Sequence, residues 1–273
     1  MSASQSQSLA AAPLLRRTVS GGVATLTLDD PASRNALSLA MIAALSGAVA
    51  ALADDRGVRA VVLAAEGPVF SSGHDLREMA AHRDDRDGGA AFFTKLMRAC
   101  AGMMQAIAAL PQPVIAAVEG IATAAGCQLV ATCDLAFAGE CARFALPGVN
   151  VGLFCSTPLV AVARNVSRKH AMELALTGAL YSAAEAERIG LVNRVVPSGS
   201  AASRALAMAD DLASRSAATI AIGKRAFQQQ IELGLGEAYE LASRAMVENL
   251  LHPDADEGIG AFLQKRPPRW DAK

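Results

Sequence analysis

One stretch of the chain, residues 113–128, combines a strand with a turn whose residue types could hold an anionic oxygen. Its apolar run 114–118 predicts a buried strand. Gly120 ends this strand, and the small residues 123–126 would let a ligand lie against the backbone where a helix begins. The first amide N–H groups of a helix have no partner inside the helix and carry the positive end of its dipole. The stretch predicts either an oxyanion-binding turn or, more simply, close packing of a buried strand on a buried helix.

A second stretch, residues 68–79, repeats this arrangement. It follows another apolar run, 58–64, and places a glycine turn directly before His74. Two such turns can supply two N–H donors to a single oxygen atom. The presence of both turns therefore favours the oxyanion-binding interpretation over simple packing.

Four runs of the chain resemble, in their order and spacing, the enoyl-CoA hydratase/isomerase (crotonase) superfamily. They are Phe-Ser-Ser-Gly-His-Asp-Leu-Arg-Glu-Met, Pro-Val-Ile-Ala-Ala-Val-Glu-Gly, Ala-Gly-Cys-Gln-Leu-Val-Ala-Thr-Cys-Asp-Leu and Leu-Thr-Gly-Ala-Leu-Tyr-Ser-Ala-Ala-Glu-Ala. The resemblance covers nearly the whole chain, from residue 19 to residue 270. It implies an α/β fold with a crotonase-like ββα-superhelix spiral core, a helical C-terminal oligomerisation region and a pocket for a CoA thioester. The run 147–158 is most similar to the subgroup called enoyl-CoA hydratase domain-containing protein 3.

The resemblance also assigns roles to individual residues. It makes the backbone N–H groups of His74 and Ala125 the donors to the thioester oxygen. Alanine at 125, where the family more usually has glycine, keeps this donor if its φ angle is ordinary. Implied contacts with the CoA thioester are Arg34, Ala36, Ser72, Asp75, Leu76, Arg77, Gly126 and, on the C-terminal helices, Lys224, Phe262 and Lys265, which often reach a neighbouring subunit's pocket. A solvated side chain is an equally good interpretation of Arg34.

Two carboxylates that the resembling hydratases use are absent from this chain. Gln128 and Gly148 stand where those enzymes have glutamates, and Ser156 stands where dienoyl-CoA isomerases have an aspartate. Adding water to a conjugated double bond requires one group to take a proton and another to deliver one, which paired carboxylates do well. The usual hydration mechanism is therefore not expected. The alternatives are a non-catalytic acyl-CoA binder or regulator, and thioester hydrolysis or decarboxylation with the oxyanion hole alone.

Three other side chains near these turns could take part in chemistry. The His74 imidazole titrates near neutrality and could act as a base, although packing or solvation away from the pocket is the better interpretation. Cys155 and Ser156 could form a nucleophile pair, but neither has a basic neighbour in the sequence, and a small buried thiol is the simpler interpretation of Cys155.

Composition and charge exclude several function classes. The 273 residues are 52% hydrophobic and 19% charged, and the net charge of −1 comes from interspersed residues rather than blocks. This pattern gives no electrostatic footprint for nucleic acid or an anionic membrane, and no apolar run reaches membrane-spanning length without interruption. Five cysteines without Cys-x-x-Cys spacing argue against a disulfide framework and a metal site, and predict a cytoplasmic protein. We expect no cofactor apart from the CoA thioester itself.

The order of the segments predicts one α/β domain with an N-terminal tail and a helical C-terminal part. We expect a disordered tail over 1–15, a crotonase-fold core over 16–197 and a C-terminal helical region over 198–273. Residues 14–17 also suggest, faintly, a transit peptide. The charged segment 80–89 is predicted as a solvated loop, with a mobile lid over the pocket as the alternative. A homotrimer or a dimer of trimers follows from the resemblance. Predicted strands are 23–28, 58–64, 114–118, 134–139 and 143–146, and predicted helices are 39–52, 90–110, 171–177, 182–189 and 200–214. Asn35 or Ser38 is expected to cap the first of these helices, Ser156 or Thr157 a further helix, and the run Ser182-Ala-Ala-Glu185 predicts a capping box.

Overall fold

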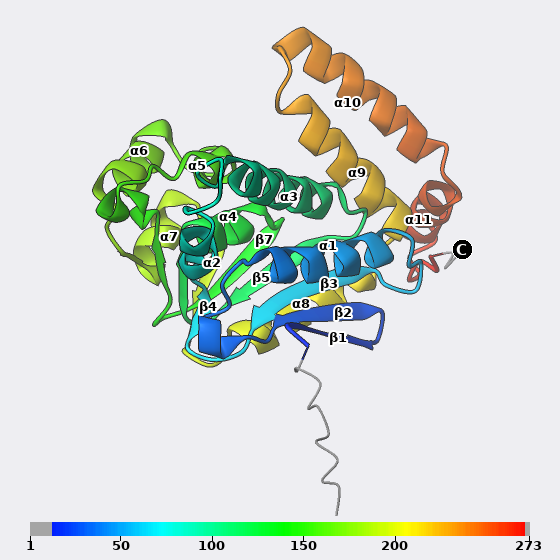
Figure 1. The fold of residues 1–273 in the computed structure, drawn as a ribbon. Coiled ribbons are helices and arrows are strands. Elements are labelled where there is room, and N and C mark those ends of the chain that lie inside the picture. The colour runs from blue at the N-terminus through cyan, green and yellow to red at the C-terminus, as the bar shows by residue number, and fades with distance from the viewer. Residues whose placement is uncertain (1–12, 271–273) are drawn as a thin grey trace, which may run out of the picture.

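The larger of two sheets has six strands and forms the centre of the protein (Figure 1). The computed structural model describes residues 13–270. Apart from β1, which is antiparallel to β2, neighbouring strands of this sheet run parallel. In spatial order they are β1 (Leu15–Ser20), β2 (Val23–Leu28), β3 (Ala60–Ala65), β5 (Val114–Val118), β7 (Leu135–Gly139) and β10 (Arg194–Val196).

A second, four-stranded sheet is built from short strands that directly follow strands of the first. Its order is β4 (Val69–Ser71), β6 (Ile121–Thr123), β8 (Arg143–Ala145) and β9 (Tyr181–Ser182). The chain thus passes from β3 to β4, from β5 to β6 and from β7 to β8, and each pair leads into a helix. This repetition of strand, strand and helix confirms the predicted ββα spiral.

Both faces of the larger sheet are buried because alternate side chains of its central strands face opposite helices. On β5, Ile115 and Ala117 pack with α8 (Ala201–Ala213), which lies in the C-terminal third of the chain. The other side chains of β5 face a larger cluster formed with α1 (Leu39–Ala53), α3 (Ala90–Ala109) and α4 (Ala125–Thr132). The predicted C-terminal region therefore contributes to the core through α8.

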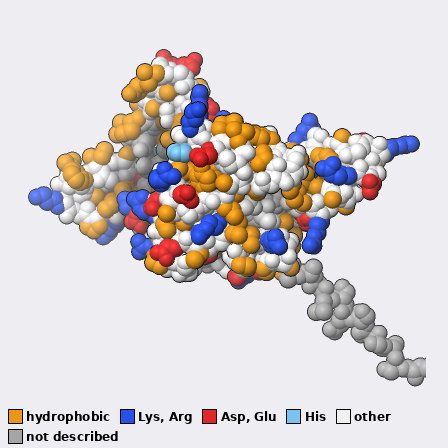
Figure 2. All heavy atoms as spheres, turned by 90° about the vertical axis from the view of Figure 1, so that its left-hand side faces the viewer, with side chains coloured by type: hydrophobic (Ala, Val, Ile, Leu, Met, Phe, Trp, Pro, Cys, Tyr) orange, Lys and Arg blue, Asp and Glu red, His pale blue; other side chains and the backbone are white. Residues whose placement is uncertain are grey.

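Short helices alternate with the strands of the second sheet along the chain. They are α2 (Leu76–Ala81), α5 (Ser156–Val162), α6 (Arg168–Thr177) and α7 (Ala183–Ile189), with short 3-10 turns η1 (Pro31–Ser33) and η2 (Pro147–Val151). Ser182 and Glu185 form the predicted capping box at the start of α7. The expected cap at the start of α5 was wrong: Cys155, not Ser156 or Thr157, is the N-cap residue, and its side chain makes no capping hydrogen bond. On the side of the molecule where these helices lie, hydrophobic side chains gather between scattered charged ones (Figure 2).

The last helices form an arm that projects from the core (Figure 1). It consists of α9 (Ala217–Gln230), α10 (Leu235–Leu250) and α11 (Pro253–Leu263). The arm is attached by Lys224, whose Nζ lies 2.6 Å from Asp134 Oδ2 and donates to the Gln112 carbonyl at 3.0 Å. Burial raises the pKa of Asp134, and the positive charge of Lys224 opposes this effect. No residue of α10 is buried.

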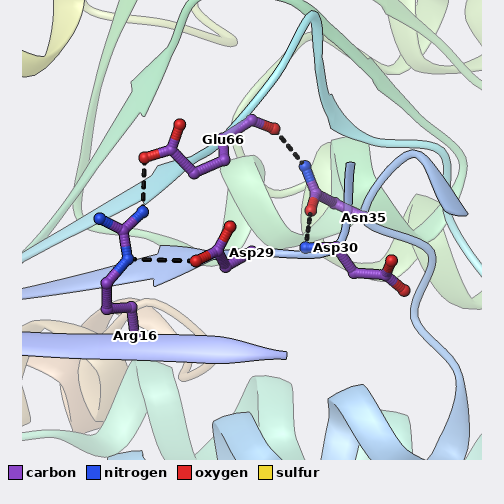
Figure 3. Close-up of polar contacts among 5 residues, drawn as sticks. All are labelled: Arg16, Asp29, Asp30, Asn35 and Glu66. Atoms are coloured by element: carbon purple, nitrogen blue, oxygen red, sulfur yellow. Dashed lines mark hydrogen bonds and ion pairs between the residues drawn. The ribbon is translucent and has the colours of Figure 1, made fainter. Parts of the chain in front are cut away.

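The N-terminal segment differs from its prediction where it enters the structure. Of the predicted tail, 1–15, residues 1–12 lie outside the described residues, and Leu15 is already the first residue of β1. Arg16, which suggested a transit peptide, pairs with Asp29 at 3.1 Å and with Glu66 at 2.5 Å (Figure 3). Residues 15–17 are therefore part of the folded sheet.

The segment 80–89 is folded against α3. His82 Nδ1 lies 2.7 Å from Asp85 Oδ2, and the His82 ring stacks on Phe92 with centroids 3.7 Å apart. Asp87 accepts hydrogen bonds from the amides of Gly89 and Ala91, which anchors the start of α3. These contacts favour the loop interpretation over the lid.

Candidate functional site

The two turns predicted from the sequence lie next to each other at one edge of the second sheet. Strands β4 and β6 are parallel neighbours, with Val69 opposite Ile121 and Ser71 opposite Ala122. Because parallel strands end at the same edge, the chain leaves both strands side by side. The contact is close: a Cβ built on Gly73 would lie 3.1 Å from the backbone nitrogen of Ala125.

The amides of His74 and Ala125 both remain available as donors. Within residues 13–270, neither N–H group donates a hydrogen bond to another backbone or side-chain group. Ala125 is the first residue of α4, where an amide has no partner inside the helix. Its φ angle is not among the positive ones, so alanine keeps the donor in the way expected from the sequence.

Glycines at this edge allow the backbones to approach more closely than any side chain would permit. A Cβ on Gly126 would lie 2.3 Å from the Ser71 carbonyl oxygen, and one on Gly120 would lie 2.1 Å from that of Pro68. Both contacts are with backbone atoms, which cannot swing aside as a flexible side chain can. Gly126, predicted as a ligand contact, thus packs its α-carbon closely against β4.

Ala124, between the end of β6 and α4, has an uncommon backbone conformation. Its φ is 50° and its ψ is −120°, in a region that favours glycine. Its N–H donates to the Ala145 carbonyl at 2.9 Å, and the neighbouring Thr123 Oγ1 donates to the Ser72 carbonyl at 3.1 Å. Strain of this kind persists only where the surrounding contacts determine the conformation. Here it stands directly beside one of the two free amides.

A third segment, residues 34–37, closes the site from the side of α1. Arg34 and Asn35 both have positive φ angles, of 62° and 51°. The Arg34 carbonyl accepts from Ser72 N at 3.1 Å, and Leu37 N donates to the Gly73 carbonyl at 2.7 Å. These bonds tie the segment to the first of the two turns.

Asn35 holds this segment in place with its side chain. Its Oδ1 accepts from Asp30 N at 2.9 Å, and its Nδ2 donates to the Glu66 carbonyl at 2.9 Å (Figure 3). The same Nδ2 also donates to the Val69 carbonyl at 2.8 Å. The residue is fully buried and its amide is satisfied at both ends. The sequence suggested Asn35 or Ser38 as the cap of α1; Ser38 is the cap, and Asn35 is a buried clamp.

Seven of the predicted site residues line one cavity of about 330 Å³. Two of them, Arg34 and Arg77, can bring positive charge to it. The Asp75 carboxylate is already engaged, because it accepts from the amides of Arg77 and Glu78 and so caps α2. The complete lining is Ala32, Ser33, Arg34, Ala36, Ser72, His74, Asp75, Leu76 and Arg77.

The two positions without glutamate are both buried. Gln128 is 4% exposed, and its Oε1 has no hydrogen-bond partner in the described part of the chain. Gly148, the second residue of η2, faces the loop that follows it: a Cβ there would lie 2.9 Å from both Cys155 Sγ and the Leu153 carbonyl oxygen. The space in which a glutamate side chain would begin at 148 is therefore occupied.

The other candidate groups are not poised for proton transfer or nucleophilic attack at neutral pH. Burial lowers the pKa of His74 to about 4, so its imidazole is neutral, and its Nε2 is buried without a partner among the described residues. His74 lines the cavity rather than pointing fully away from it. Burial also raises the pKa of the Cys155 thiol, which agrees with the simpler interpretation of a buried thiol. Ser156 Oγ donates to the Phe154 carbonyl at 3.4 Å.

Three C-terminal residues do not belong to this cavity within one chain. Phe262, 82% exposed, and Lys265 lie at the end of α11 and are not part of its lining. Lys224 was expected to reach a CoA pocket, but it is buried against Asp134 at the base of β5. Sequence reasoning missed this pair because nothing in the local pattern connects residues 90 positions apart.

The sequence analysis also missed the side chains that hold the three segments together. Thr123 was counted only as a small residue, and Asn35 only as a possible helix cap. Their hydrogen bonds reach across 51 and 31 positions of the chain. A polar residue within a run of small or apolar ones was the only available signal.

Comparison with known proteins decides the family. A family profile described as Enoyl-CoA hydratase/isomerase matches residues 18–273. This chain belongs to the enoyl-CoA hydratase/isomerase family. The superfamily and the crotonase-like fold expected from the sequence are thereby confirmed.

Relatives from this family support the predicted subgroup as well. The rat protein (Rattus norvegicus) named Enoyl-CoA hydratase domain-containing protein 3, mitochondrial, is 47% identical over 249 residues, which are 91% of this chain and 81% of the relative. The human protein of that name is also 47% identical, over 91% of this chain and 80% of its own length. The crystal structure of human enoyl-CoA hydratase domain-containing protein 3 superposes with a TM-score of 0.89 and 45% identity, covering 94% of this chain and 100% of that one.

An enoyl-CoA hydratase from Mycobacterium smegmatis has a similar structure. Its crystal structure superposes with a TM-score of 0.90 at 51% identity and covers 95% of this chain and 99% of that one. The long common length shows that the similarity includes the C-terminal arm as well as the spiral core.

The predicted cytoplasmic location is wrong by this comparison, because the rat and human relatives are mitochondrial by name. The prediction rested on cysteines, and the five thiols are indeed free. Free thiols argue only against an oxidising compartment, however, and do not distinguish one reducing compartment from another.

The described residues offer neither a membrane-spanning helix nor a cluster of metal ligands. None of the helices within residues 13–270 combines the length and apolar character needed to cross a bilayer. In the same residues, no group of three or more His, Cys, Asp or Glu side chains is arranged to hold a metal ion.

Proposed function

We propose that this protein binds an acyl-CoA thioester and polarises its carbonyl oxygen with the backbone amides of His74 and Ala125, without carboxylate-driven hydration. The observation that carries the proposal is the pair of unpartnered amides at the common edge of β4 and β6. Thioester chemistry at the carbonyl or at Cα places negative charge on this oxygen. Two fixed donors stabilise that charge without having to reorganise.

The adjoining cavity supports a ligand with an anionic part. Arg34 and Arg77 are in its lining, and guanidinium groups bind phosphate oxygens with two parallel hydrogen bonds. The phosphates of coenzyme A have this chemistry, and the acyl end would then extend toward the two amides. The same cavity contains Asp75, whose carboxylate is held by the amides of α2 and is a poor candidate for a base.

The groups around the acyl end argue against ordinary hydration. Gln128 offers a hydrogen-bond acceptor but no exchangeable carboxyl proton, and Gly148 has no side chain. The His74 imidazole is neutral at pH 7 but, with its low pKa, is a weak base. The proposal is therefore a thioester-binding protein in which carbonyl polarisation is retained and the paired proton transfer is lost.

The first experiment compares two ligands that differ only at the carbonyl. Acetyl-CoA and its thioether analogue S-ethyl-CoA would be titrated by calorimetry into the purified protein. We expect the thioester to bind about tenfold more tightly, the contribution of one to two neutral hydrogen bonds. Equal affinities, or no binding of either ligand, would contradict the proposal.

A pair of variants at Ala125 tests whether the difference in affinity between the thioester and the thioether comes from the Ala125 backbone N–H. Ala125→Pro removes the N–H at the first position of a helix, where proline is otherwise tolerated, and Ala125→Gly keeps it. We expect the proline variant to lose most of the preference for the thioester and the glycine variant to retain it. Thermal melting of both variants checks that the fold is intact.

A second assay tests the absence of hydration. Crotonyl-CoA would be mixed with the protein, and the absorbance of the conjugated enoyl thioester would be followed. We expect no loss of absorbance above the buffer control. Turnover at a rate typical of enzymes would show that another group transfers the proton and would remove this half of the proposal.

We also propose that the protein assembles as a homotrimer or a dimer of trimers. Support comes from the arm: α10 has no buried residue, yet it carries Tyr239 and Val247 exposed, and Leu251, 80% exposed, follows it directly. An apolar helical face of this kind is typical of an oligomer interface. Phe262 at the end of α11 would then lie where a neighbouring subunit can meet it.

Sedimentation of the wild-type protein and of Leu251→Glu tests the assembly. We expect a trimer or hexamer for the wild type and a smaller species for the variant, because a buried interface does not accept an unpaired charge. Val19→Glu, at an exposed apolar residue of β1, is the control and should sediment as the wild type does. A monomeric wild type would contradict the proposal.

A further inference from the structure

One side-chain hydrogen bond joins the two turns that carry the free amides. Thr123 Oγ1 donates to the Ser72 carbonyl at 3.1 Å, and it is the one side-chain hydrogen bond between residues 71–75 and 121–126 in the described structure. The backbone ladder of β4 and β6 has its last pair at Ser71 and Ala122. The hydroxyl therefore continues the connection one residue beyond the point where the strands stop pairing.

Each of the two residues that form this bond lies two positions before one of the donors. Ser72 precedes His74 by two residues, and Thr123 precedes Ala125 by two residues. A change in the separation of Ser72 and Thr123 would alter the separation and direction of the two N–H groups. Close packing of Gly73 on the turn before α4 limits how near the two turns can come, but it does not stop them from moving apart, which the Thr123 hydrogen bond opposes.

Backbone strain at Ala124, beside the bond, would drive the turn to change conformation if the Thr123 hydrogen bond were removed. Ala124 has a φ of 50°, which an alanine rarely adopts. Its own N–H is held by the Ala145 carbonyl at 2.9 Å, and the residue before it is held by Ser72. Removing one of these two restraints would allow the peptide that carries the Ala125 N–H to rotate toward a relaxed conformation.

We propose that Thr123 is a positioning residue, whose hydroxyl sets the spacing of the His74 and Ala125 amides and so the degree to which a bound thioester carbonyl is polarised. This inference rests on the proposed function, since it concerns the same carbonyl. Thr123 touches neither the ligand nor the reacting atoms in this role; it acts through Ser72 and Ala124. A side chain of the same shape without the hydroxyl would fill the space but would not hold the spacing.

The test uses Thr123→Val, which keeps the shape and removes the hydroxyl, and Thr123→Ser, which keeps the hydroxyl. Each full-length protein would be mixed with acetyl-CoA labelled with ¹³C at the carbonyl, and the resonance of the bound carbonyl would be compared with that of the free ligand. Polarisation by the two amides shifts this resonance downfield. Titrations with acetyl-CoA and S-ethyl-CoA accompany the spectra, and thermal melting checks the fold.

We expect a downfield shift in the wild type that is at least halved in Thr123→Val and restored in Thr123→Ser. The preference for thioester over thioether should fall about threefold to tenfold in the valine variant, the usual contribution of one hydrogen bond, while thioether affinity stays unchanged. If valine lowers the melting temperature too far for binding studies, Thr123→Ser and Thr123→Ala at lower temperature provide the same comparison.

The possible outcomes separate this inference from the proposed function. If the wild type shows no downfield shift, the oxyanion proposal fails, and the role of Thr123 fails with it. If the wild type shows the shift and Thr123→Val keeps it in full, the oxyanion proposal stands and the positioning role is overturned. Equal losses of thioester and thioether affinity in the valine variant would also overturn it, because they would show a general disturbance of the pocket.

Discussion

The half of the site that would hold the carbonyl oxygen is built from backbone, whereas the half that would move protons depends on side chains. In the first half, the amides of His74 and Ala125 are free and adjacent, although Ala125 is not the usual glycine. In the second half, Gln128 and Gly148 supply no carboxylate. Backbone chemistry survives a change of side chain, and side-chain chemistry does not.

The packing around the two halves differs in the same sense. Around the amides, glycines bring backbone against backbone, so the geometry is fixed by contacts that tolerate no added atom. Around Gly148, the Cys155 thiol and the Leu153 carbonyl occupy the space in which a side chain would begin. Close packing thus holds the two amides in place in the carbonyl half, while in the other half it leaves no room for a carboxylate at 148.

The largest predicted effect comes from a variant that disrupts the packing around the two amides. Gly126→Ala would place a Cβ 2.3 Å from the Ser71 carbonyl oxygen, so α4 and β4 must move apart. We expect a loss of about 3 kcal/mol or more in the free energy of unfolding, together with loss of thioester preference. Urea unfolding and the two-ligand titration measure these effects.

The control is the same substitution, glycine to alanine, at a helical glycine that has free space around it. Gly102 lies in α3, and a Cβ there would meet no atom within 4 Å. Gly102→Ala should therefore stabilise the protein by up to about 1 kcal/mol, since alanine favours a helix. Similar losses in both variants would show that close packing is not what distinguishes Gly126.

The next prediction concerns the half that contains Gln128 and Gly148. Gly148→Glu, alone or with Gln128→Glu, should cost about 2 kcal/mol in unfolding free energy and should not produce hydration of crotonyl-CoA. The Cβ would lie within 2.9 Å of a backbone carbonyl as well as of Cys155 Sγ, so removing the thiol does not by itself create the space. Gly47→Glu, on the open surface of α1, is the control and should stabilise the protein by up to about 1 kcal/mol, since glutamate favours a helix over glycine. Rapid hydration by the double variant would show that the loop is more adaptable than its packing indicates.

A smaller effect should appear as a pH dependence of stability that belongs to the carbonyl half. Burial lowers the pKa of His74 to about 4, below its ordinary value of 6.5. Between these pH values the unfolded chain binds a proton that the folded protein does not, so stability is full above pH 6.5 and falls as the pH decreases toward 4. We expect a loss of about 2 kcal/mol across this window, less than the full shift allows because the ring is not completely buried.

The variant His74→Gln tests this assignment, because it keeps the backbone amide and removes the titrating ring. Urea midpoints at pH 7 and at pH 4.5 should differ less in the variant than in the wild type. Thioester preference at pH 7 should remain, since the donor is the backbone N–H. An unchanged pH dependence would show that other groups cause the acid sensitivity.

The sequence allowed prediction of most of the spiral and of the two turns for physical reasons that are local. A continuous apolar run bounded by Gly and Pro predicted β5 with the observed bounds, and Ser38 was a recognisable cap for α1. The family resemblance then placed the free amides at residues 74 and 125. These features depend on short segments whose chemistry is visible in the order of the residues.

What the sequence could not predict depends on contacts between distant segments. The role of Lys224 follows from Asp134, 90 positions away, and the occupied space at Gly148 follows from the path of the loop that ends at Cys155. The positive φ of Ala124 likewise depends on how β6, β8 and β4 meet, because its neighbours hold it from two sides. None of these has a local pattern that distinguishes it from an ordinary small or charged residue.

The smallest predicted effect sharpens the comparison by separating two neighbouring alanines within the carbonyl half. Ala124→Gly removes a Cβ from a residue with a φ of 50°, which relieves about 1 to 3 kcal/mol of strain, while the more flexible unfolded chain offsets part of this gain. We expect a net stabilisation of about 1 kcal/mol in urea unfolding.

Ala125→Gly, one residue later at an ordinary φ, relieves no strain and should destabilise by about 0.5 to 1 kcal/mol. Opposite signs at adjacent positions would assign the strain to Ala124, because the greater freedom of the unfolded chain by itself predicts a loss at both. If both variants are less stable than the wild type, the backbone at 124 is not strained in solution, and Thr123 has no stored distortion to restrain.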